Sequence, residues 1–178
     1  MLERLGVQVV EVRLPEHLEG LSGLIIPGGE STTIGKLAVD FDLLEPLRKF
    51  GAENAVWGTC AGAIFLSKDV HRQQPLLQLM DIAVERNAFG RQIASFEIDL
   101  DIAALEEVAP GAGPFHAVFI RAPLIASVDG DAQALARLED GRIVAARQGR
   151  LLATAFHPEL TGDDRFHRYF LRLADEHS

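Results

Sequence analysis

Residues 55–66 read Ala55-Val56-Trp57-Gly58-Thr59-Cys60-Ala61-Gly62-Ala63-Ile64-Phe65-Leu66. The apolar run at 55–58 predicts a buried strand, and residues 61–66 predict a helix that begins directly after Cys60. A strand that turns sharply into a helix is the repeating unit of a parallel α/β sheet. This segment therefore predicts an α/β fold with a tight turn at Cys60.

Two short β-branched runs precede this turn. Val7 to Val12 and Leu24 to Ile26 both predict strands. The second run stops abruptly at Pro27-Gly28-Gly29, which is typical of a buried strand that enters a tight turn. The N-terminal part is therefore expected to add strands to the same sheet.

Three further helices are expected. The first is short, is capped by Ser31 or Thr32 and runs through Leu37. The last is amphipathic and runs roughly from Asp163 to Glu176. Between them, one apolar face of another helix is marked by Leu43, Leu44, Leu47 and Phe50.

Beyond Met80 the pattern changes to alternating strands. Asp140-Gly141 and Gln148-Gly149 are hairpin signals around the apolar runs Ile143 to Arg147 and Leu151 to Phe156. Together these elements predict a three-layer αβα sandwich with a mixed, mostly parallel sheet and an antiparallel extension. The 178 residues fit one domain covering 1–178, since domains commonly contain about 100 to 200 residues.

Composition excludes several classes of partner. Seventeen Lys and Arg against 26 Asp and Glu give a net charge of −9. Nucleic acid and anionic membranes attract basic surfaces, so neither is an expected partner. No run approaches the roughly 18 apolar residues of a membrane span, and the N-terminus lacks the features of a secretory signal. We therefore expect a cytoplasmic protein.

Cys60 is the single cysteine and lies in a G-x-C-x-G sequence between a strand and a helix. This context is that of a nucleophile elbow, in which the side chain stands at the start of the helix. The partial positive charge there favours a thiolate, and the N–H of Ala61 is free to hold an oxyanion. A lone cysteine is often only a small buried apolar residue, but the flanking glycines favour the nucleophile.

His157 is the histidine best placed to serve this cysteine. It follows the apolar strand at 151–156, and sites in open sheets form at strand ends. If the chain stays extended through Pro158, the Glu159 carboxylate lies on the same side and can orient the imidazole. His-Pro-Glu alone is more typical of a solvated loop, so this interpretation depends on the pairing with Cys60.

The segment Pro27-Gly28-Gly29-Glu30-Ser31-Thr32-Thr33 resembles a phosphate-binding loop only superficially. Five residues separate Gly29 from Gly35, and Leu37 stands where Ser or Thr is required. No G-x-G-x-x-G sequence occurs either, so no nucleotide cofactor is expected. A Gly-Gly turn at a strand end instead offers backbone N–H groups, and Gly29 is the expected second half of an oxyanion hole.

Two arginines at apparent strand ends are candidate substrate ligands. Arg86 and Arg121 can each hold a carboxylate through two hydrogen bonds, although such residues are more often in surface ion pairs. The other histidines have no i, i+4 pairing and no cysteine partner, so no metal site is expected. They are His17, His71, His116, His167 and His177.

With Cys60, His157 and Glu159 in this chain order, the sequence resembles the class I (triad) glutamine amidotransferases. Within them it resembles the family of glutaminase subunits of pyridoxal 5′-phosphate synthase over nearly the whole chain. The motifs that carry this resemblance are Pro27 to Thr33, Gly58 to Gly62, Glu85-Arg86-Asn87-Ala88-Phe89-Gly90-Arg91-Gln92, Phe119-Ile120-Arg121-Ala122-Pro123 and Phe156-His157-Pro158-Glu159-Leu160.

The resemblance implies a function and a set of site residues. It implies hydrolysis of L-glutamine to glutamate and ammonia without a cofactor, with Cys60 as nucleophile, His157 as general acid and base, and Glu159 as its orienting carboxylate. It also implies that the partner is a synthase subunit, which receives the ammonia in a hetero-oligomer. The residues implied to hold glutamine are Gly29, Glu30, Ser31, Arg86, Ile120 and Arg121.

The N-terminus departs from this family. Members begin with a further strand carrying a Leu-Gln-Gly motif, ahead of a segment similar to Leu5-Gly6-Val7-Gln8-Val9, whereas this chain starts inside the helix between them. The resemblance therefore implies that a central strand is missing, through a misplaced start codon or a truncation. We expect exposed apolar edges as a result, and an effect on the oxyanion hole or on docking to the synthase.

Three alternatives remain open. One is a cysteine hydrolase of the α/β-hydrolase type, which shares the elbow but carries its acid before the histidine in sequence. Another is a shortened chain that binds the synthase without turnover. The third is an amidotransferase subunit serving histidine or purine synthesis, which the sequence from Glu85 to Gln92 disfavours.

Overall fold

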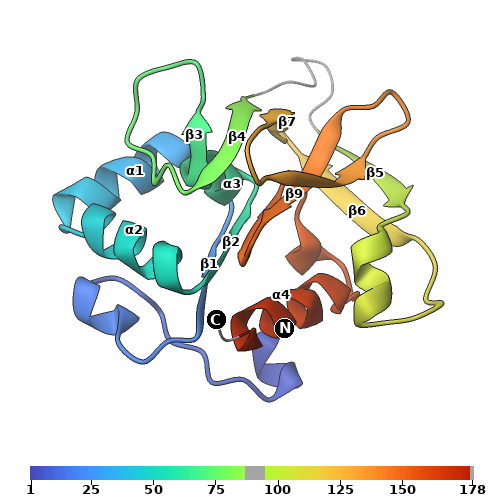
Figure 1. The fold of residues 1–178 in the computed structure, drawn as a ribbon, viewed down its shortest axis with the longest axis horizontal. Helices are drawn as coiled ribbons and strands as arrows, with labels where there is room; N and C mark the ends of the chain where they lie inside the picture. The colour runs from blue at the N-terminus through green and yellow to red at the C-terminus, as the bar shows by residue number, and fades with distance from the viewer. Residues whose placement is uncertain (87–94, 177–178) are drawn as a thin grey trace.

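The computed structural model describes residues 1–86 and 95–176 (Figure 1). Its main sheet has the order β1-β2-β10-β9-β7-β4-β3, and β8 pairs with β9. The strands of this sheet are β1 (Gly23–Ile26), β2 (Ala55–Thr59), β3 (Ser67–Asp69), β4 (Met80–Glu85), β7 (Leu124–Val128), β8 (Gln133–Arg137), β9 (Ile143–Gln148) and β10 (Leu151–Thr154).

The sheet is mixed, as the sequence predicts. Strands β1, β2 and β10 run parallel to one another, and β3 runs parallel to β4. Strand β9 is antiparallel to β7, β8 and β10, and β7 is antiparallel to β4. Gly141 and Gly149 sit at the two predicted hairpin turns with φ of +87° and +54°, values that glycine adopts without strain.

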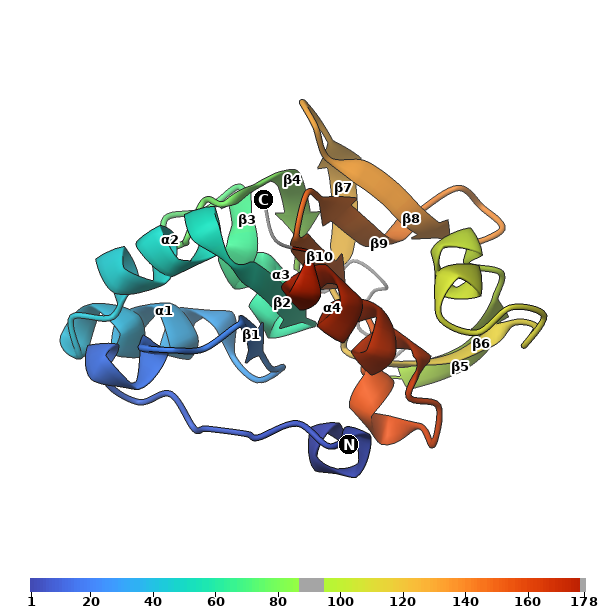
Figure 2. The same ribbon diagram turned by 60° about the horizontal axis from the view of Figure 1, so that its bottom comes forward.

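Helices cover both faces of the strands β1 and β2. Figure 2 shows α1 (Ser31–Asp40) and α2 (Leu44–Glu53) on one side of these strands and α4 (Arg165–Asp175) on the other. Helix α3 (Ala61–Leu66) packs on β2 and against α1. Four short 3-10 helices complete the described helical structure: η1 (Leu2–Leu5), η2 (Pro15–Leu18), η3 (Ala103–Glu107) and η4 (Pro158–Leu160).

The core is divided by β2, whose side chains alternate between the two faces of the sheet. Val56 belongs to the cluster that contains Leu47 and Phe65, whereas Trp57 belongs to the cluster that contains Phe166 and Phe170. Because both faces of β2 are buried, its sequence is apolar throughout rather than alternating. The predicted layered α/β class is thus confirmed.

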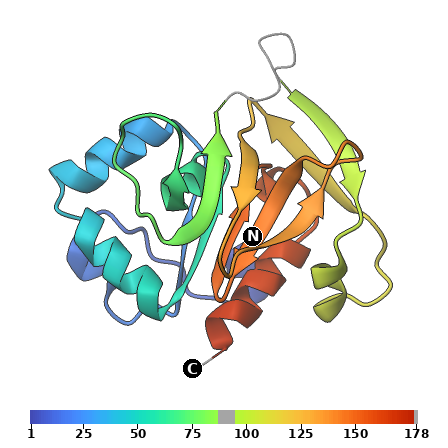
Figure 3. The same ribbon diagram turned by 45° about the horizontal axis from the view of Figure 1, so that its top comes forward.

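A separate antiparallel ribbon consists of β5 (Ser95–Leu100) and β6 (Phe115–Ile120). Figure 3 shows it on the opposite side of the molecule from α1 and α2. It is attached to the main body where the Val118 carbonyl of β6 accepts a hydrogen bond from the His157 amide, 2.9 Å away. The ribbon therefore reaches the end of β10.

Two local predictions were wrong. Val7 to Val12 form no strand: within the described residues this segment is irregular and pairs with no strand, because a groove lies between it and the edge strand β1. The cap of α1 is Glu30 rather than Ser31 or Thr32, since its carboxylate accepts a hydrogen bond from the Thr32 amide, and the helix continues to Asp40.

The exposed apolar side chains of this region lie in the N-terminal segment rather than on the edge strand β1, whose residues are half-buried or buried. Val9, Val10 and Leu14 are each more than a third exposed. A groove of about 1450 Å³ is lined by residues 7–14, by β1 and by side chains of α1, α2 and α4. The open edge of the sheet therefore lies in this groove.

Candidate active site

Cys60 occupies the turn between β2 and α3. Its backbone has φ +50° and ψ −106°, a conformation that residues other than glycine rarely adopt. Two hydrogen bonds hold this turn: the Cys60 amide donates to the Thr154 carbonyl at 2.8 Å, and the Ala63 amide donates to the Cys60 carbonyl at 3.1 Å. The residue is buried and 8% exposed. Such stored strain at a strand-to-helix turn is typical of a nucleophile elbow.

The glycines on either side of Cys60 have a different role from the sharp turn that the sequence predicts. Neither Gly58 nor Gly62 has a positive φ; the cysteine itself does. A Cβ at Gly62 would lie 1.9 Å from the Ile26 carbonyl oxygen, and one at Gly58 would lie 2.4 Å from the Gly62 backbone. The glycines are therefore needed for close packing of α3 against β1 and β2.

His157 connects Cys60 with Glu159. The Nδ1 atom of His157 is 2.7 Å from Oε1 of Glu159, and the imidazole also hydrogen-bonds the Cys60 side chain. The chain does not stay extended here, as the sequence interpretation assumed, because residues from Pro158 onward turn as η4. This turn brings the carboxylate back to the ring, so the expected contact forms by a different geometry.

These two hydrogen bonds determine the charge of His157. The bond with Cys60, and then the bond with Glu159, raise the pKa of His157 from 6.5 to about 10, against the effect of burial. Burial acts to raise the pKa of Glu159, but its hydrogen bonds, first that with His157, bring it below the usual value. At neutral pH the site therefore holds an imidazolium beside a carboxylate.

Gly28 and Gly29 form the turn that lies against this triad. A Cβ at Gly28 would lie 2.7 Å from Cε1 of His157 and 3.4 Å from Cβ of Cys60, so the backbone of the turn after β1 approaches both side chains directly. Gly29 has φ +141°, which favours glycine there. The predicted Gly-Gly turn is thus brought next to the nucleophile.

Glu30, Ser31 and Arg86 meet beside this turn. Nη2 of Arg86, which follows β4, lies 2.5 Å from Oε1 of Glu30, and the Arg86 side chain is 20% exposed. Ser31 is almost fully buried. Gln74 lies between them: its Nε2 donates to Ser31 Oγ at 3.3 Å, and its Oε1 accepts from Nη1 of Arg86 at 3.4 Å.

The remaining candidate ligands come from the end of β6. Ile120 is its last residue and Arg121 follows with φ +42°. In the described part of the chain, no hydrogen bond or ion pair joins Arg121 to the triad or to Arg86. The β6 strand itself reaches His157 through Val118. The motif residues Asn87 to Gln92 lie outside the described residues.

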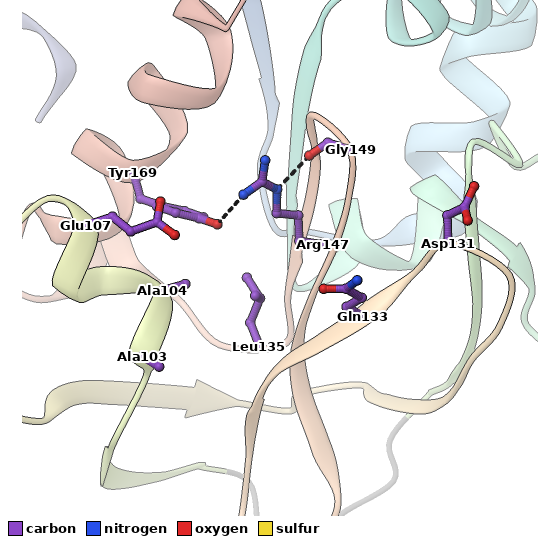
Figure 4. Close-up of a pocket in the computed structure, with 9 residues that line it drawn as sticks. All are labelled: Ala103, Ala104, Glu107, Asp131, Gln133, Leu135, Arg147, Gly149 and Tyr169. Atoms are coloured by element: carbon purple, nitrogen blue, oxygen red, sulfur yellow. Dashed lines mark hydrogen bonds between the residues drawn. The ribbon is translucent and has the colours of Figure 1, made fainter.

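A second pocket, of about 480 Å³, lies away from these residues. Figure 4 shows that Arg147 occupies it and donates to the Tyr169 hydroxyl at 2.9 Å and to the Gly149 carbonyl at 2.7 Å. Its guanidinium thus ties β9 to α4. The other lining residues are Ala103, Ala104, Glu107, Asp131, Gln133 and Leu135.

Residues 1–86 and 95–176 contain neither a metal-binding cluster nor a membrane-spanning helix. Within these ranges, no cluster of three or more His, Cys, Asp or Glu side chains is arranged to hold a metal ion. None of the helices there has the length and apolar character needed to span a bilayer.

The sequence profile of the SNO glutamine amidotransferase family matches residues 1–176. This chain belongs to that family. It is 60% identical over 178 residues to the pyridoxal 5′-phosphate synthase subunit PdxT of Herpetosiphon aurantiacus, covering 97% of this chain and 91% of the relative. It is 58% identical over 174 residues to the subunit of the same name from Moorella thermoacetica, covering 97% and 89%.

Solved structures agree with membership of the amidotransferase family. A crystal structure of a glutamine amidotransferase superposes with a TM-score of 0.88 at 52% identity, over 97% of this chain and 89% of the other. A GMP synthase protein of Thermoplasma acidophilum superposes with a TM-score of 0.60 at 19% identity, over 90% of this chain and 76% of that one, and shares the fold.

Two residues of this candidate site were not singled out from the sequence. Gly28 was expected only to form a turn, because its close approach to His157 joins the chain after β1 to the chain after β10, on either side of β2. Gln74 lies in a segment without any motif, and the two residues that it contacts are 43 and 12 positions away. No sequence signal marks either contact.

Proposed function

We propose that this chain hydrolyses L-glutamine to L-glutamate and ammonia, with Cys60 as nucleophile, His157 as general acid and base, and Glu159 as the carboxylate that orients His157. The observation that carries this proposal is that Cys60, at a strained strand-to-helix turn, and His157 both lie against the Gly28 backbone, with His157 Nδ1 2.7 Å from Glu159 Oε1. A nucleophile, its base and an orienting acid in contact are the requirements of covalent acyl transfer.

In the first half of the reaction, the proton of Cys60 already resides on His157 as the imidazolium, and the Cys60 sulfur attacks the carbonyl carbon of the glutamine side-chain amide as a thiolate. The oxygen becomes negatively charged in the tetrahedral intermediate. The N–H of Ala61, in the first turn of α3, and that of Gly29 are proposed to hold this oxyanion, because N–H groups of a first helical turn lack partners within the helix.

In the second half, the carbon–nitrogen bond breaks and His157 gives its proton to the leaving nitrogen, which departs as ammonia. The glutamyl group then remains on Cys60 as a thioester. His157 takes a proton from a water molecule, which attacks the thioester, and the carbon–sulfur bond breaks to release glutamate. The raised pKa of His157 keeps a proton available for the leaving group.

The glutamine main-chain groups are proposed to bind on one side of the nucleophile. Glu30 accepts hydrogen bonds and attracts the α-amino group, while the Arg86 guanidinium offers donors to the α-carboxylate. Gly29, Ser31, Ile120 and Arg121 complete the proposed set. Support comes from the contact between Glu30 and Arg86 beside the Gly28-Gly29 turn.

The ammonia is proposed to pass to a synthase subunit that makes pyridoxal 5′-phosphate, the active form of vitamin B6, in a hetero-oligomer in the cytoplasm. Support comes from the relatives at 58% and 60% identity, which are named subunits of that synthase. Neither a nucleic acid nor a membrane partner is proposed, since the chain carries a net charge of −9.

The test is glutamate release from L-glutamine by the purified chain, alone and mixed with a synthase subunit, with Cys60→Ala as the blank. We expect release by the parent chain in the mixture and none by the variant. An esterase activity without glutaminase activity would favour the α/β-hydrolase alternative, which the position of Glu159 after His157 already disfavours. No turnover in either mixture would favour a subunit that only binds.

A further inference from the structure

Gln74 lies where two parts of the proposed glutamine site meet. Its amide nitrogen donates to the buried hydroxyl of Ser31, at the start of α1, at 3.3 Å. Its amide oxygen accepts from Nη1 of Arg86, after β4, at 3.4 Å. The Gln74 side chain thus connects Ser31 with Arg86, which lie far apart in the sequence.

The segment that carries Gln74 is hydrogen-bonded to two helices. The Leu77 and Leu79 amides donate to carbonyls at the end of α3, at 2.8 Å and 3.1 Å, and the Arg48 guanidinium holds the carbonyls of Leu76 and Leu77 at 2.8 Å and 3.1 Å. These bonds link the segment to α2 as well as to α3. The backbone of this loop is therefore held in place by hydrogen bonds that do not involve the Gln74 side chain.

The same segment touches α1 on the helix face that carries Ser31. Gly35 lies one turn after Ser31, and a Cβ there would lie only 2.7 Å from the Pro75 carbonyl oxygen. The residue next to Gln74 therefore packs directly on the α1 backbone. This contact sets the distance between the Gln74 amide and the Ser31 hydroxyl.

Charge explains why an amide suits this position. Arg86 already has one carboxylate partner, Glu30, at its Nη2 atom. A second carboxylate would neutralise the guanidinium and compete with an anionic ligand, whereas an amide oxygen orients Nη1 and leaves the positive charge in place. The 3.4 Å bond is long, so Nη1 can also turn to a ligand at little cost.

We propose that Gln74 is a positioning residue of the glutamine site, which orients Arg86 and Ser31 for the α-carboxylate end of the substrate. This inference rests on the proposed function and adds a residue to the same site. Gln74 does not reach the reacting atoms, so its role is in binding. Its loss therefore changes the KM for glutamine rather than kcat.

The test compares three variants of the full chain in complex with a synthase subunit. Gln74→Met keeps the length of the side chain and removes both hydrogen bonds, and we expect a rise in KM of about three- to tenfold with kcat within about twofold. Gln74→Glu adds a carboxylate beside Arg86, so we expect a larger rise. The matched control is Gln73→Met, at the neighbouring exposed position, with unchanged KM.

A binding arm separates this inference from the proposed function. The Kd of L-glutamine is measured by calorimetry for Cys60→Ala, with and without Gln74→Met, in the same complex. We expect the second substitution to weaken binding by the same factor as it raises KM. Binding without hydrolysis by the parent chain overturns the proposed function and leaves the role of Gln74 intact.

Three results overturn this inference and leave the proposed function standing. The first is an unchanged KM and Kd in Gln74→Met, and the second is a loss in kcat that equals the loss in kcat/KM. The third is an equal effect of Gln73→Met, which would indicate a general disturbance of the loop. Absence of glutamine binding to Cys60→Ala overturns this inference together with the proposed function.

Discussion

At the scale of single residues, the site is an arrangement of charge around His157. Its imidazole interacts with the Cys60 sulfur and the Glu159 carboxylate, and each of these interactions favours the protonated ring. Only 14% of the His157 side chain is exposed, so water screens these interactions weakly. The imidazolium is therefore a property of the folded site, because the unfolded chain has no such contacts.

The first prediction concerns the titration of His157. We expect its ring resonances, followed by NMR, to show a midpoint well above 6.5, toward the value of about 10. Cys60→Ala removes the largest cause of the shift and Glu159→Gln the second, so both variants should titrate at lower pH. A midpoint near 6.5 in the parent chain, identified by comparison with His157→Gln, contradicts this account.

The sign of the linked stability follows from the same shift. Since the folded pKa lies above the unfolded value of 6.5, the folded chain binds this proton more tightly. The stabilisation by His157 is therefore fully present below pH 6.5 and is lost as the pH rises toward 10. Glu159, whose pKa is lowered, stabilises above its usual value of 4.5 and loses this effect in more acid solution.

The second prediction concerns Gly28. In Gly28→Ala the new Cβ would lie 2.7 Å from the His157 ring, which must move away from Cys60. A displacement of about 1 Å in a catalytic group can cost roughly 10²-fold in rate, so we expect a fall in kcat of about that size. Steady-state kinetics of glutamate release measure it.

The control for this variant is Gly162→Ala, where an added Cβ would meet no atom within 4 Å. We expect the control to keep the parent kcat and both variants to keep the parent melting temperature. If Gly28→Ala turns over glutamine at the parent rate, the close contact between Gly28 and His157 is not needed for catalysis.

At the scale of elements, the turn from β2 to α3 depends on close packing against β1. The third prediction is that Gly62→Ala destabilises the fold by about 1–3 kcal/mol, the usual cost of overpacking a core, because its Cβ would lie 1.9 Å from the Ile26 carbonyl oxygen. Urea unfolding measures the change, with Gly162→Ala again as control. A free energy of unfolding equal to that of the parent would contradict the packing seen here.

Elements with strong local patterns were predictable from the sequence. The apolar run into Cys60 predicts β2 and α3, and the glycine turns at 141 and 149 predict the hairpins around β9. The last helix was expected at Asp163 to Glu176 and covers Arg165–Asp175. In each case residues near one another in sequence determine the structure.

Elements that depend on distant partners were not predictable. Val7 to Val12 have the β-branched pattern of a strand, but pairing needs a neighbour, which pattern alone does not reveal. One local geometry was also missed: the contact of Glu159 with His157 was expected from an extended chain and forms instead through η4. The Gln74 contacts join three segments and leave no trace in local sequence.

At the scale of the whole molecule, one strand connects the two halves of the core. Val56 and Trp57 are adjacent on β2 yet belong to clusters on opposite faces of the sheet, and both are almost fully buried. Neither cluster can lose its packing without disturbing β2. We therefore propose that residues 1–178 form a single cooperative domain.

The fourth prediction tests this proposal by equilibrium unfolding in urea. Trp57 is the single tryptophan, so its fluorescence reports on the cluster around α4, while far-UV circular dichroism reports on all helices and strands. We expect the two transitions to coincide, as they do for a two-state domain. Separate midpoints would mean that the helical half and the antiparallel half unfold independently.

The measurement that most directly tests the central claim is mass spectrometry of the chain quenched in acid during turnover of L-glutamine with a synthase subunit. The account predicts one glutamyl group attached through a thioester to the peptide that contains Cys60, and no attachment in Cys60→Ala. A Glu159→Gln chain should accumulate it more slowly, because His157 loses its orienting carboxylate. Glutamate release without any adduct at Cys60, or release by Cys60→Ala, would contradict the account.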